Sequence, residues 1–238
     1  MPNNYSKQWF DTFMSNKDVA VTKQEASFIM RQIPISRYRT VLDLCCGVGR
    51  HTDLLTQNGY HVIGVDRDKD ALEHAKKATS GDAEYIQHDM RSISTLQYQF
   101  DAVISMWHSF GYFEEYENNN VIKQISEVLR TQGRFIIDIY NKSFMEAHLG
   151  ERQITKGEMT ITEQVSHKAN RFHVTLAYGS ELGVIDEFEW QLYTQDEIIQ
   201  VCQEYNMKCI TACANFDENQ PISKSIPRMQ LVFEKDAS

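Results

Sequence analysis

Residues 41–66, VLDLCCGVGRHTDLLTQNGYHVIGVD, decide the fold of this chain. An apolar run is followed by a turn with two glycines, a helical segment that ends at Gly59, and a second apolar run that ends at an aspartate. The glycines let a ligand approach the backbone closely, and the helix N-terminus offers free N–H groups. The stretch therefore predicts a strand, a helix and a second strand that together bind a nucleotide-like ligand.

Strands and helices alternate regularly after Thr40, and several of the strands are uniformly apolar. Such strands are typical of a parallel sheet that is covered on both faces. We therefore expect a doubly wound α/β domain with a mostly parallel, seven-stranded sheet. Within it, the segment VIKQISEVLRTQG predicts a helix that stops at Gly133, before the strand RFIIDIYN.

The pattern changes after Asn141. Segments that alternate apolar and polar residues predict a small antiparallel sheet over residues 151–192, inserted into the main domain. The main domain then comprises residues 40–150 and 193–238. Its last helix begins with a capping box formed by Thr194 and Glu197.

The first 39 residues predict a helical segment that covers the cofactor site, with Thr22 and Glu25 as a second capping box. Three aromatic residues there either fold over the cofactor or form a helix packing stripe: Tyr5, Trp9 and Phe10.

Charge and composition narrow the possible partners. The 238 residues include 33 acidic and 24 basic ones, a net charge of −9, which repels phosphate backbones and anionic membranes. No apolar stretch is long enough to span a bilayer and no signal segment is evident, so we expect a cytoplasmic protein, monomer or homodimer, with no membrane or nucleic-acid partner. The five cysteines lack the spacing of a disulfide framework or a metal site, so we expect reduced thiols and no metal.

Two ligands fit the glycine turn, a dinucleotide such as NAD and S-adenosylmethionine. Asp66 lies 19 residues after Gly47, where a carboxylate can bind the hydroxyls of a ribose in either ligand. A dinucleotide site requires a third glycine where this chain has Thr52. Asp43, four residues before Gly47, would repel a pyrophosphate but attract the ammonium of a methionine moiety. S-adenosylmethionine is therefore favoured.

With these residues, the stretch resembles the first two motifs of the class I S-adenosylmethionine-dependent methyltransferases. HDMR, FDAVISMWHSFGYF and LRTQGRFIIDIYN are similar to the later motifs in order and spacing. The resemblance covers residues 40–141 and, more loosely, the helix TQDEIIQVCQEYN with the two closing strands. It implies S-adenosylmethionine as cofactor and S-adenosylhomocysteine as product.

The resemblance also implies the cofactor-binding residues. In it, the glycine turn passes under the methionine portion, Asp66 binds the ribose, Asp89 accepts from the adenine amino group, and Met106 and Trp107 flank the sulfonium. Asp66 and Asp89 could instead be helix caps or turn residues. The expected set is Asp43, Cys45, Gly47, Gly49, Asp66, Arg67, Asp89, Met90, Met106 and Trp107.

The acceptor is expected to be a small molecule methylated on nitrogen or oxygen, because the segment after the fourth strand, SMWH, lacks the Pro-Pro-aromatic motif of nucleic-acid amino methyltransferases. His108 is the candidate general base, and Tyr112 and Tyr140 are candidate pocket residues. The antiparallel insertion resembles a lid over the acceptor, with four candidate contacts: Arg171, His173, Trp190 and Tyr193. A nicotinamide-dependent oxidoreductase and a non-catalytic binding protein of the same fold are the alternatives.

Overall fold

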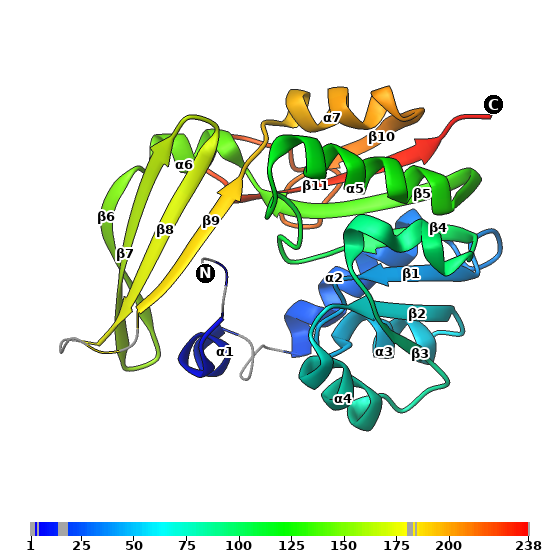
Figure 1. Cartoon of the computed structure of the whole chain (residues 1–238), viewed down its shortest axis with the longest axis horizontal. Coiled ribbons are helices and arrows are strands. Elements are labelled where there is room, and N and C mark those ends of the chain that lie inside the picture. Colours follow the sequence, from blue (N-terminus) through cyan, green and yellow to red (C-terminus); the bar gives the residue numbers. More distant parts are fainter. Residues whose placement is uncertain (1–2, 4, 14–18, 180–182, 184, 238) are drawn as a thin grey trace.

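A sheet of seven strands, in the order β10-β11-β5-β4-β1-β2-β3, forms the larger part of the computed structural model, which describes residues 3, 5–13, 19–179, 183 and 185–237 (Figure 1). Strands β3, β2, β1, β4 and β5 pair in parallel, whereas β11 runs antiparallel to β5 and β10. The predicted doubly wound, mostly parallel sheet is confirmed. The strands are β1 (Thr40–Leu44), β2 (His61–Asp66), β3 (Glu84–Gln87), β4 (Phe100–Ser105), β5 (Leu129–Tyr140), β10 (Met207–Cys213) and β11 (Arg228–Lys235).

Helices cover both faces of this sheet, because successive strand residues point to opposite sides. Leu42 and Leu44 pack in the core beneath η1, α5 and α7, whereas Val41 packs in the core beneath α2 and α3. Within the described residues, no helix is long and apolar enough to cross a membrane. The helices are α1 (Lys7–Phe13), α2 (Val19–Gln32), α3 (Arg50–Gln57), α4 (Lys69–Ala78), η1 (Met90–Leu96), α5 (Glu115–Val128), α6 (Lys142–Ala147) and α7 (Gln195–Glu204).

A second, antiparallel sheet in the order β6-β7-β8-β9 stands beside the larger one, at the left in Figure 1. Its alternating strands bury one face, which carries Phe172, Val174 and Trp190. The strands are β6 (Gly150–Lys156), β7 (Met159–Lys168), β8 (Arg171–Tyr178) and β9 (Ile185–Gln191).

The N-terminal residues connect to this second sheet. Asp186 of β9 accepts hydrogen bonds from the backbone N–H of Ser6 at 3.0 Å and from its hydroxyl at 2.7 Å. The amide of Asn3 donates to the carbonyl of Glu189 at 3.0 Å. Helix α1 therefore lies against β9, near the lower end of the second sheet in Figure 1.

Two local predictions are wrong and one is confirmed. The helix expected to stop at Gly133 is α5, which ends at Val128, because β5 begins at Leu129 and pairs with β4. Thr22 lies inside α2 instead of at its start, and the Glu25 carboxylate is bound by side chains of other elements. The capping box of Thr194 and Glu197 begins α7 as predicted.

Candidate cofactor and acceptor site

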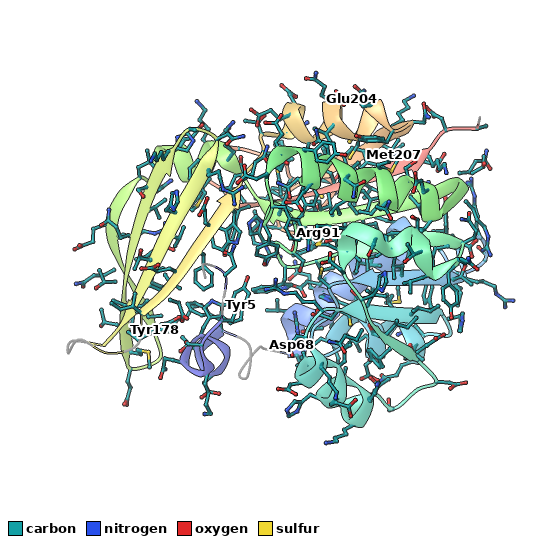
Figure 2. All side chains as sticks on the ribbon, viewed as in Figure 1. Tyr5, Asp68, Arg91, Tyr178, Glu204 and Met207 are labelled. Carbon is teal, nitrogen blue, oxygen red and sulfur yellow. The ribbon has the colours of Figure 1, made fainter. Side chains whose placement is uncertain are left out.

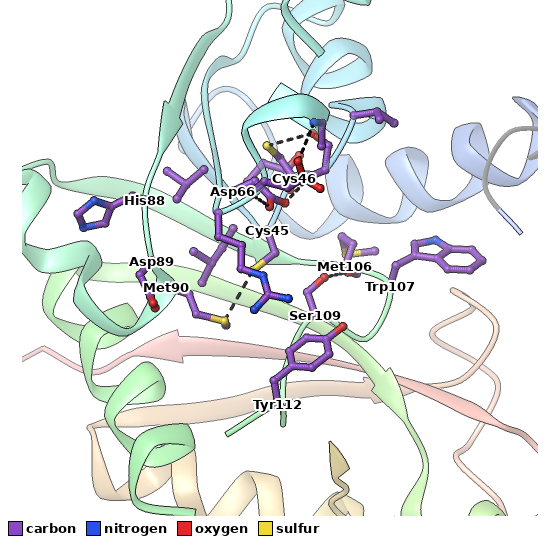
Figure 3. A pocket seen from close by; sticks show the side chains of 18 of the residues that line it. Cys45, Cys46, Asp66, His88, Asp89, Met90, Met106, Trp107, Ser109 and Tyr112 are labelled. Atoms are coloured by element: carbon purple, nitrogen blue, oxygen red, sulfur yellow. Dashed lines mark hydrogen bonds between the residues drawn. The ribbon is translucent and has the colours of Figure 1, made fainter. Parts of the chain in front are cut away.

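A cavity of about 290 Å³ lies at the carboxyl ends of β1, β2 and β4. This is the edge at which open α/β sheets bind ligands. Figure 3 shows Asp89 and Met90 on one side of it, Met106 and Trp107 on the other, and Tyr112 pointing toward it. Apart from Gly49, all residues of the expected cofactor-binding set line the cavity: Asp43, Cys45, Gly47, Asp66, Arg67, Asp89, Met90, Met106 and Trp107.

Asp66 at the end of β2 holds the glycine turn in place. One carboxylate oxygen accepts the N–H of Gly47 at 2.8 Å, and the other accepts the N–H of Asp68 at 2.9 Å. Gly49 has a φ of 77°, and a Cβ there would lie 2.4 Å from the Tyr85 hydroxyl. Gly49 therefore shapes the turn from behind, whereas Asp66 lines the cavity.

Asp43 is a buried carboxyl group on β1. The hydroxyl of Thr52 donates to it at 2.6 Å, so the residue that replaces the third glycine of a dinucleotide site instead binds Asp43. Burial raises the pKa of Asp43, and nearby His51 and the Thr52 hydrogen bond oppose this effect. A cation in the cavity would offset the cost of burying the charged form, so the site fits the ammonium of S-adenosylmethionine.

Asp89 is bound by its neighbour Arg91. The guanidinium donates from Nε to Oδ1 at 3.0 Å and from a terminal nitrogen to Oδ2 at 2.6 Å, and the Arg91 N–H also donates to Oδ1 at 2.9 Å. Hydrogen bonding to Arg91 lowers the pKa of Asp89. Asp89 is thus both the N-cap of η1 and a wall of the cavity, and an adenine amino group there would share its oxygens with Arg91.

Trp107 lies within a network of charged groups at the opposite wall. Its indole N–H donates to the buried carboxylate of Glu25 at 2.6 Å, and His51 Nε2 lies 2.8 Å from the same carboxylate. The guanidinium carbons of Arg228 and Arg50 lie 4.2 Å and 5.6 Å from the centroid of the indole ring. Helix α2, which carries Glu25, therefore fixes the orientation of a cavity-lining side chain.

His108 follows Trp107, and both have a positive φ, 56° and 60°, which is uncommon for residues other than glycine. Asp138 holds this backbone: its carboxylate accepts the Trp107 N–H at 3.0 Å and its carbonyl accepts the His108 N–H at 2.9 Å. His108 Nδ1 accepts the backbone N–H of Tyr140 at 3.2 Å, so the proton of the neutral ring is on Nε2.

The electrostatics of His108 do not favour a general base. Burial, aided by the positive charge of Arg228, lowers its pKa to about 3, so the ring is neutral at pH 7. Since Nδ1 is occupied and Nε2 carries a proton, neither nitrogen is free to accept a proton. In this arrangement, His108 therefore has no free nitrogen with which to act as the general base that the sequence suggested.

Of the two tyrosines expected at the acceptor pocket, Tyr112 lines the cavity, whereas Tyr140 lies outside the cavity lining, with its ring 4.5 Å from that of His108. The hydroxyl of Tyr112 lies 2.6 Å from that of Tyr5, which stands between the two sheets (Figure 2). Burial raises the pKa of Tyr112, and it raises the pKa values of Tyr5 and Tyr140 to about 12. All three phenols are protonated at neutral pH. Tyr5 and Trp9 both line the cavity, whereas the side chain of Phe10 lies outside the described residues.

The four residues predicted to contact the acceptor from the lid lie in different surroundings. Arg171 donates to the carbonyl oxygens of Phe113 at 2.7 Å and Tyr112 at 3.3 Å, which ties β8 to the loop after β4. Trp190 is buried beside His108, with ring centroids 5.0 Å apart. The other two lie elsewhere: His173 is half-exposed beside Glu189, and Tyr193 packs on Phe110 in the core of the larger sheet.

Several cavity residues were not expected from the sequence. Arg50 and Arg91 lie within the stretches that carry the resemblance but were not named as site residues, and Ser109 and Phe113 belong to the loop after β4. Arg50 could have been predicted to line the cavity, because it is the first residue of α3 and follows the glycine turn directly. The position of Phe113 depends on a hydrogen bond from Arg171, 58 positions along the chain, so the neighbouring sequence does not predict it.

Thiol groups also lie at the cavity. Cys45 and Cys46 line it, and the Cys45 thiol donates to the sulfur of Met90 at 3.7 Å. Burial raises the pKa of both thiols. Among the described residues, no three His, Cys, Asp or Glu side chains are grouped to hold a metal ion.

Comparison with known proteins shows that this chain is similar to methyltransferases. Residues 41–133 match the family model described as methyltransferase domain. The putative methyltransferase YqeM of Bacillus subtilis (strain 168) is 32% identical over 106 residues, 42% of each chain. The dTDP-3-amino-3,4,6-trideoxy-alpha-D-glucopyranose N,N-dimethyltransferase of Streptomyces venezuelae is 27% identical over 139 residues, 57% of each chain. The matches span about half the length of these relatives.

Solved structures share the fold over nearly the whole chain. An S-adenosylmethionine-dependent methyltransferase from Clostridium acetobutylicum ATCC 824 superposes with a TM-score of 0.81 at 17% identity, covering 97% of both chains. The CcbJ methyltransferase from Streptomyces caelestis gives 0.79 at 18% identity, covering 95% of this chain and 96% of that one.

The sheet order, the glycine turn and the cavity at the strand ends have the arrangement expected of an S-adenosylmethionine site of the methyltransferase type. The matched domain, the methyltransferase relatives and the shared fold support the resemblance to the class I S-adenosylmethionine-dependent methyltransferases. The resemblance seen in the sequence, and the cofactor that it implied, are confirmed.

Proposed function

We propose that this chain transfers a methyl group from S-adenosylmethionine to a nitrogen of a small molecule. The proposal is based on which residues line the cavity. Carboxylates and the glycine turn line one part of it, and the aromatic residues Tyr5, Trp9 and Tyr112 line the part that faces the second sheet. The first part suits the cofactor, and the second suits a compact organic acceptor.

The roles on the cofactor side follow from charge and position. Asp43 pairs with the ammonium of the methionine portion, and Asp66 accepts from the ribose hydroxyls with the lone pairs that its two backbone hydrogen bonds leave free. Asp89, oriented by Arg91, accepts from the adenine amino group. Arg50 is placed to pair with a carboxylate, because it lines the cavity above the N-terminus of α3.

Bound S-adenosylmethionine supplies a methyl group already activated by the positive charge on sulfur. The residues of this chain then contribute by holding the acceptor in line and by excluding water. The new bond joins the acceptor nitrogen to the methyl carbon, the carbon–sulfur bond breaks with its electrons going to sulfur, and the surplus proton on nitrogen leaves to solvent.

The protonation states of the acceptor side favour nitrogen over oxygen. His108 has no free acceptor nitrogen, and the three phenols of Tyr5, Tyr112 and Tyr140 hold their protons at neutral pH. An amine needs no base at that point, since it can bind as the free base with its lone pair available. An alcohol must lose a proton to become a strong nucleophile. Two relatives support the same choice: the N,N-dimethyltransferase of Streptomyces venezuelae and a glycine/sarcosine N-methyltransferase, which is 25% identical over 149 residues.

The net charge of −9 supports a small acceptor in place of a nucleic acid. The proposal is tested by incubating the protein with S-adenosylmethionine and a set of primary amines and of matched alcohols, and measuring S-adenosylhomocysteine by mass spectrometry. We expect product with amines, at a rate that rises with pH as the amines lose their protons. Turnover of alcohols alone would contradict the choice of nitrogen. Binding of S-adenosylhomocysteine with no turnover of either set would indicate a binding protein.

A further inference from the structure

Four ring side chains form an aromatic cluster, which we define as His108, Tyr112, Tyr140 and Trp190. The His108 ring centroid lies 4.5 Å from that of Tyr140, 5.0 Å from that of Trp190 and 6.4 Å from that of Tyr112. Tyr112 lines the cavity, whereas the other three residues lie outside its lining, so the cluster adjoins the cavity through Tyr112.

This cluster contains two buried N–H donors that have no hydrogen-bond partner among the described residues, His108 Nε2 and Trp190 Nε1. Both side chains are more than nine-tenths buried. The hydrogen on Nε2 follows from the bond that Nδ1 accepts from Tyr140. An unpaired buried donor costs about 1–3 kcal/mol, so two in adjacent rings beside a ligand cavity indicate that a ligand supplies the acceptor atom.

The charges around the cluster decide what kind of acceptor atom fits. Two cations that act on these rings are already paired: Arg228 with Asp138, and Arg152 with Glu163. Both cations act on the cluster, since Arg228 affects the titration of His108 and Arg152 that of Tyr140. A carboxylate or phosphate would therefore reach these donors without a free counter-charge, at a high desolvation cost. A neutral hydroxyl or ether oxygen needs only the two donors.

We propose that the acceptor is a hydroxylated amine whose neutral oxygen accepts hydrogen bonds from His108 Nε2 and Trp190 Nε1. The inference rests on the proposed function and narrows its substrate class. His108 is then a specificity-determining donor, held in the correct tautomer by the backbone of Tyr140. Its left-handed backbone, fixed by Asp138, directs the ring into the cluster.

The two N–H donors could instead be satisfied within the protein, and the experiment must distinguish this alternative from ligand binding. The His108 and Trp190 rings meet edge to face, with an interplanar angle of 87°, so one N–H could rest on the π face of the other ring. In that case the donors are satisfied within the protein, and removing either of them leaves ligand preference unchanged.

The experiment uses three amines of similar size: trans-2-aminocyclohexanol, cyclohexylamine and 2-aminocyclohexanecarboxylate. Their dissociation constants are measured by NMR titration on protein saturated with S-adenosylhomocysteine, so the readout does not depend on turnover. We expect the amino alcohol to bind about tenfold more tightly than cyclohexylamine, and the carboxylate to bind more weakly than both.

Two variants remove one donor each. Trp190→Phe keeps an aromatic ring without the N–H. His108→Asn keeps an oxygen to accept the Tyr140 N–H and tolerates a positive φ, but lacks Nε2. Each should reduce the preference for the amino alcohol over cyclohexylamine about three- to tenfold, with affinity for S-adenosylhomocysteine unchanged. The control is His61→Asn, an exposed histidine at the start of β2, which should keep the full preference.

Equal affinity of wild-type protein for the amino alcohol and cyclohexylamine, or an undiminished preference in both variants, would overturn the inference. Failure of the protein to bind S-adenosylhomocysteine or to methylate any amine would instead contradict the proposed function. The preference in binding can be measured whether or not methylation occurs, so the two failures are distinguishable.

Discussion

Replacing Glu25 by alanine should weaken both the fold and the cofactor site, although Glu25 belongs to α2 and is absent from the cavity wall. Its carboxylate is fully buried and accepts the indole N–H of Trp107 at 2.6 Å. It also lies 2.8 Å from His51 Nε2 and 3.7 Å from a terminal nitrogen of Arg50. All three of these partners line the cavity.

The magnitude follows from the groups left without a partner. Two buried donors without an acceptor cost about 1–3 kcal/mol each, and removing one member of a buried ion pair costs about 3–5 kcal/mol. Since these costs overlap, we expect a total of about 3–5 kcal/mol. For a chain of this length, each kcal/mol lowers Tm by about 2–4 °C, so Tm should fall by about 10 °C.

The assay combines thermal unfolding with calorimetric titration of S-adenosylhomocysteine. A matched control is Glu73→Ala, which removes a half-exposed ion pair with Lys76 and should change stability by less than about 0.5 kcal/mol. Glu25→Ala should also bind S-adenosylhomocysteine more weakly, because Trp107 and Arg50 lose their anchor. If Glu25→Ala melts within a degree of Glu73→Ala and binds with unchanged affinity, the positioning role of α2 is refuted.

Two further predictions concern titrating groups. Because burial raises the pKa of Cys45, iodoacetamide at pH 7.5 should alkylate this thiol at least about tenfold more slowly than it alkylates glutathione, and more slowly still when S-adenosylhomocysteine is bound. Mass spectrometry measures the rate. Fast labelling that S-adenosylhomocysteine does not slow would contradict the position of Cys45 in the cavity wall. The pKa of His108 is lowered to about 3 in the folded chain, so below pH 6.5 the unfolded chain binds a proton at this residue that the folded chain does not. The free energy of unfolding should therefore be highest, as far as His108 determines it, above pH 6.5 and should fall as the pH falls toward 3. In urea titrations at pH 7 and pH 5, His108→Asn should lose less stability than the wild type; an equal loss would show that His108 is not buried and neutral.

The sequence predicts well those parts of the site that depend on local geometry. Asp43, Gly47 and Asp66 lie within one strand–helix–strand unit, and the spacing of apolar runs and glycines determines where they meet. The residue that stands where a dinucleotide site has its third glycine, Thr52, uses its hydroxyl to bind Asp43.

Features that depend on contacts between distant residues were not predictable. The spacing of Thr22 and Glu25 is that of a helix cap, but tertiary contacts with Trp107, 82 positions away, use the Glu25 carboxylate instead. The helix expected to continue to Gly133 ends at Val128, because pairing of the following residues with β4 outweighs their helical pattern. The tautomer of His108 is set by the backbone of Tyr140, 32 positions away.

We propose that this chain binds S-adenosylmethionine through the carboxylates at its strand ends. Calorimetric titration of S-adenosylhomocysteine into the wild type and Asp66→Ala tests it most directly, with NAD as the competing ligand. We predict one site per chain in the wild type, an affinity about 10–100-fold lower in Asp66→Ala because two charge-assisted hydrogen bonds to the ribose are lost, and no measurable NAD binding. Tight binding of NAD, or no heat with S-adenosylhomocysteine, would contradict the account.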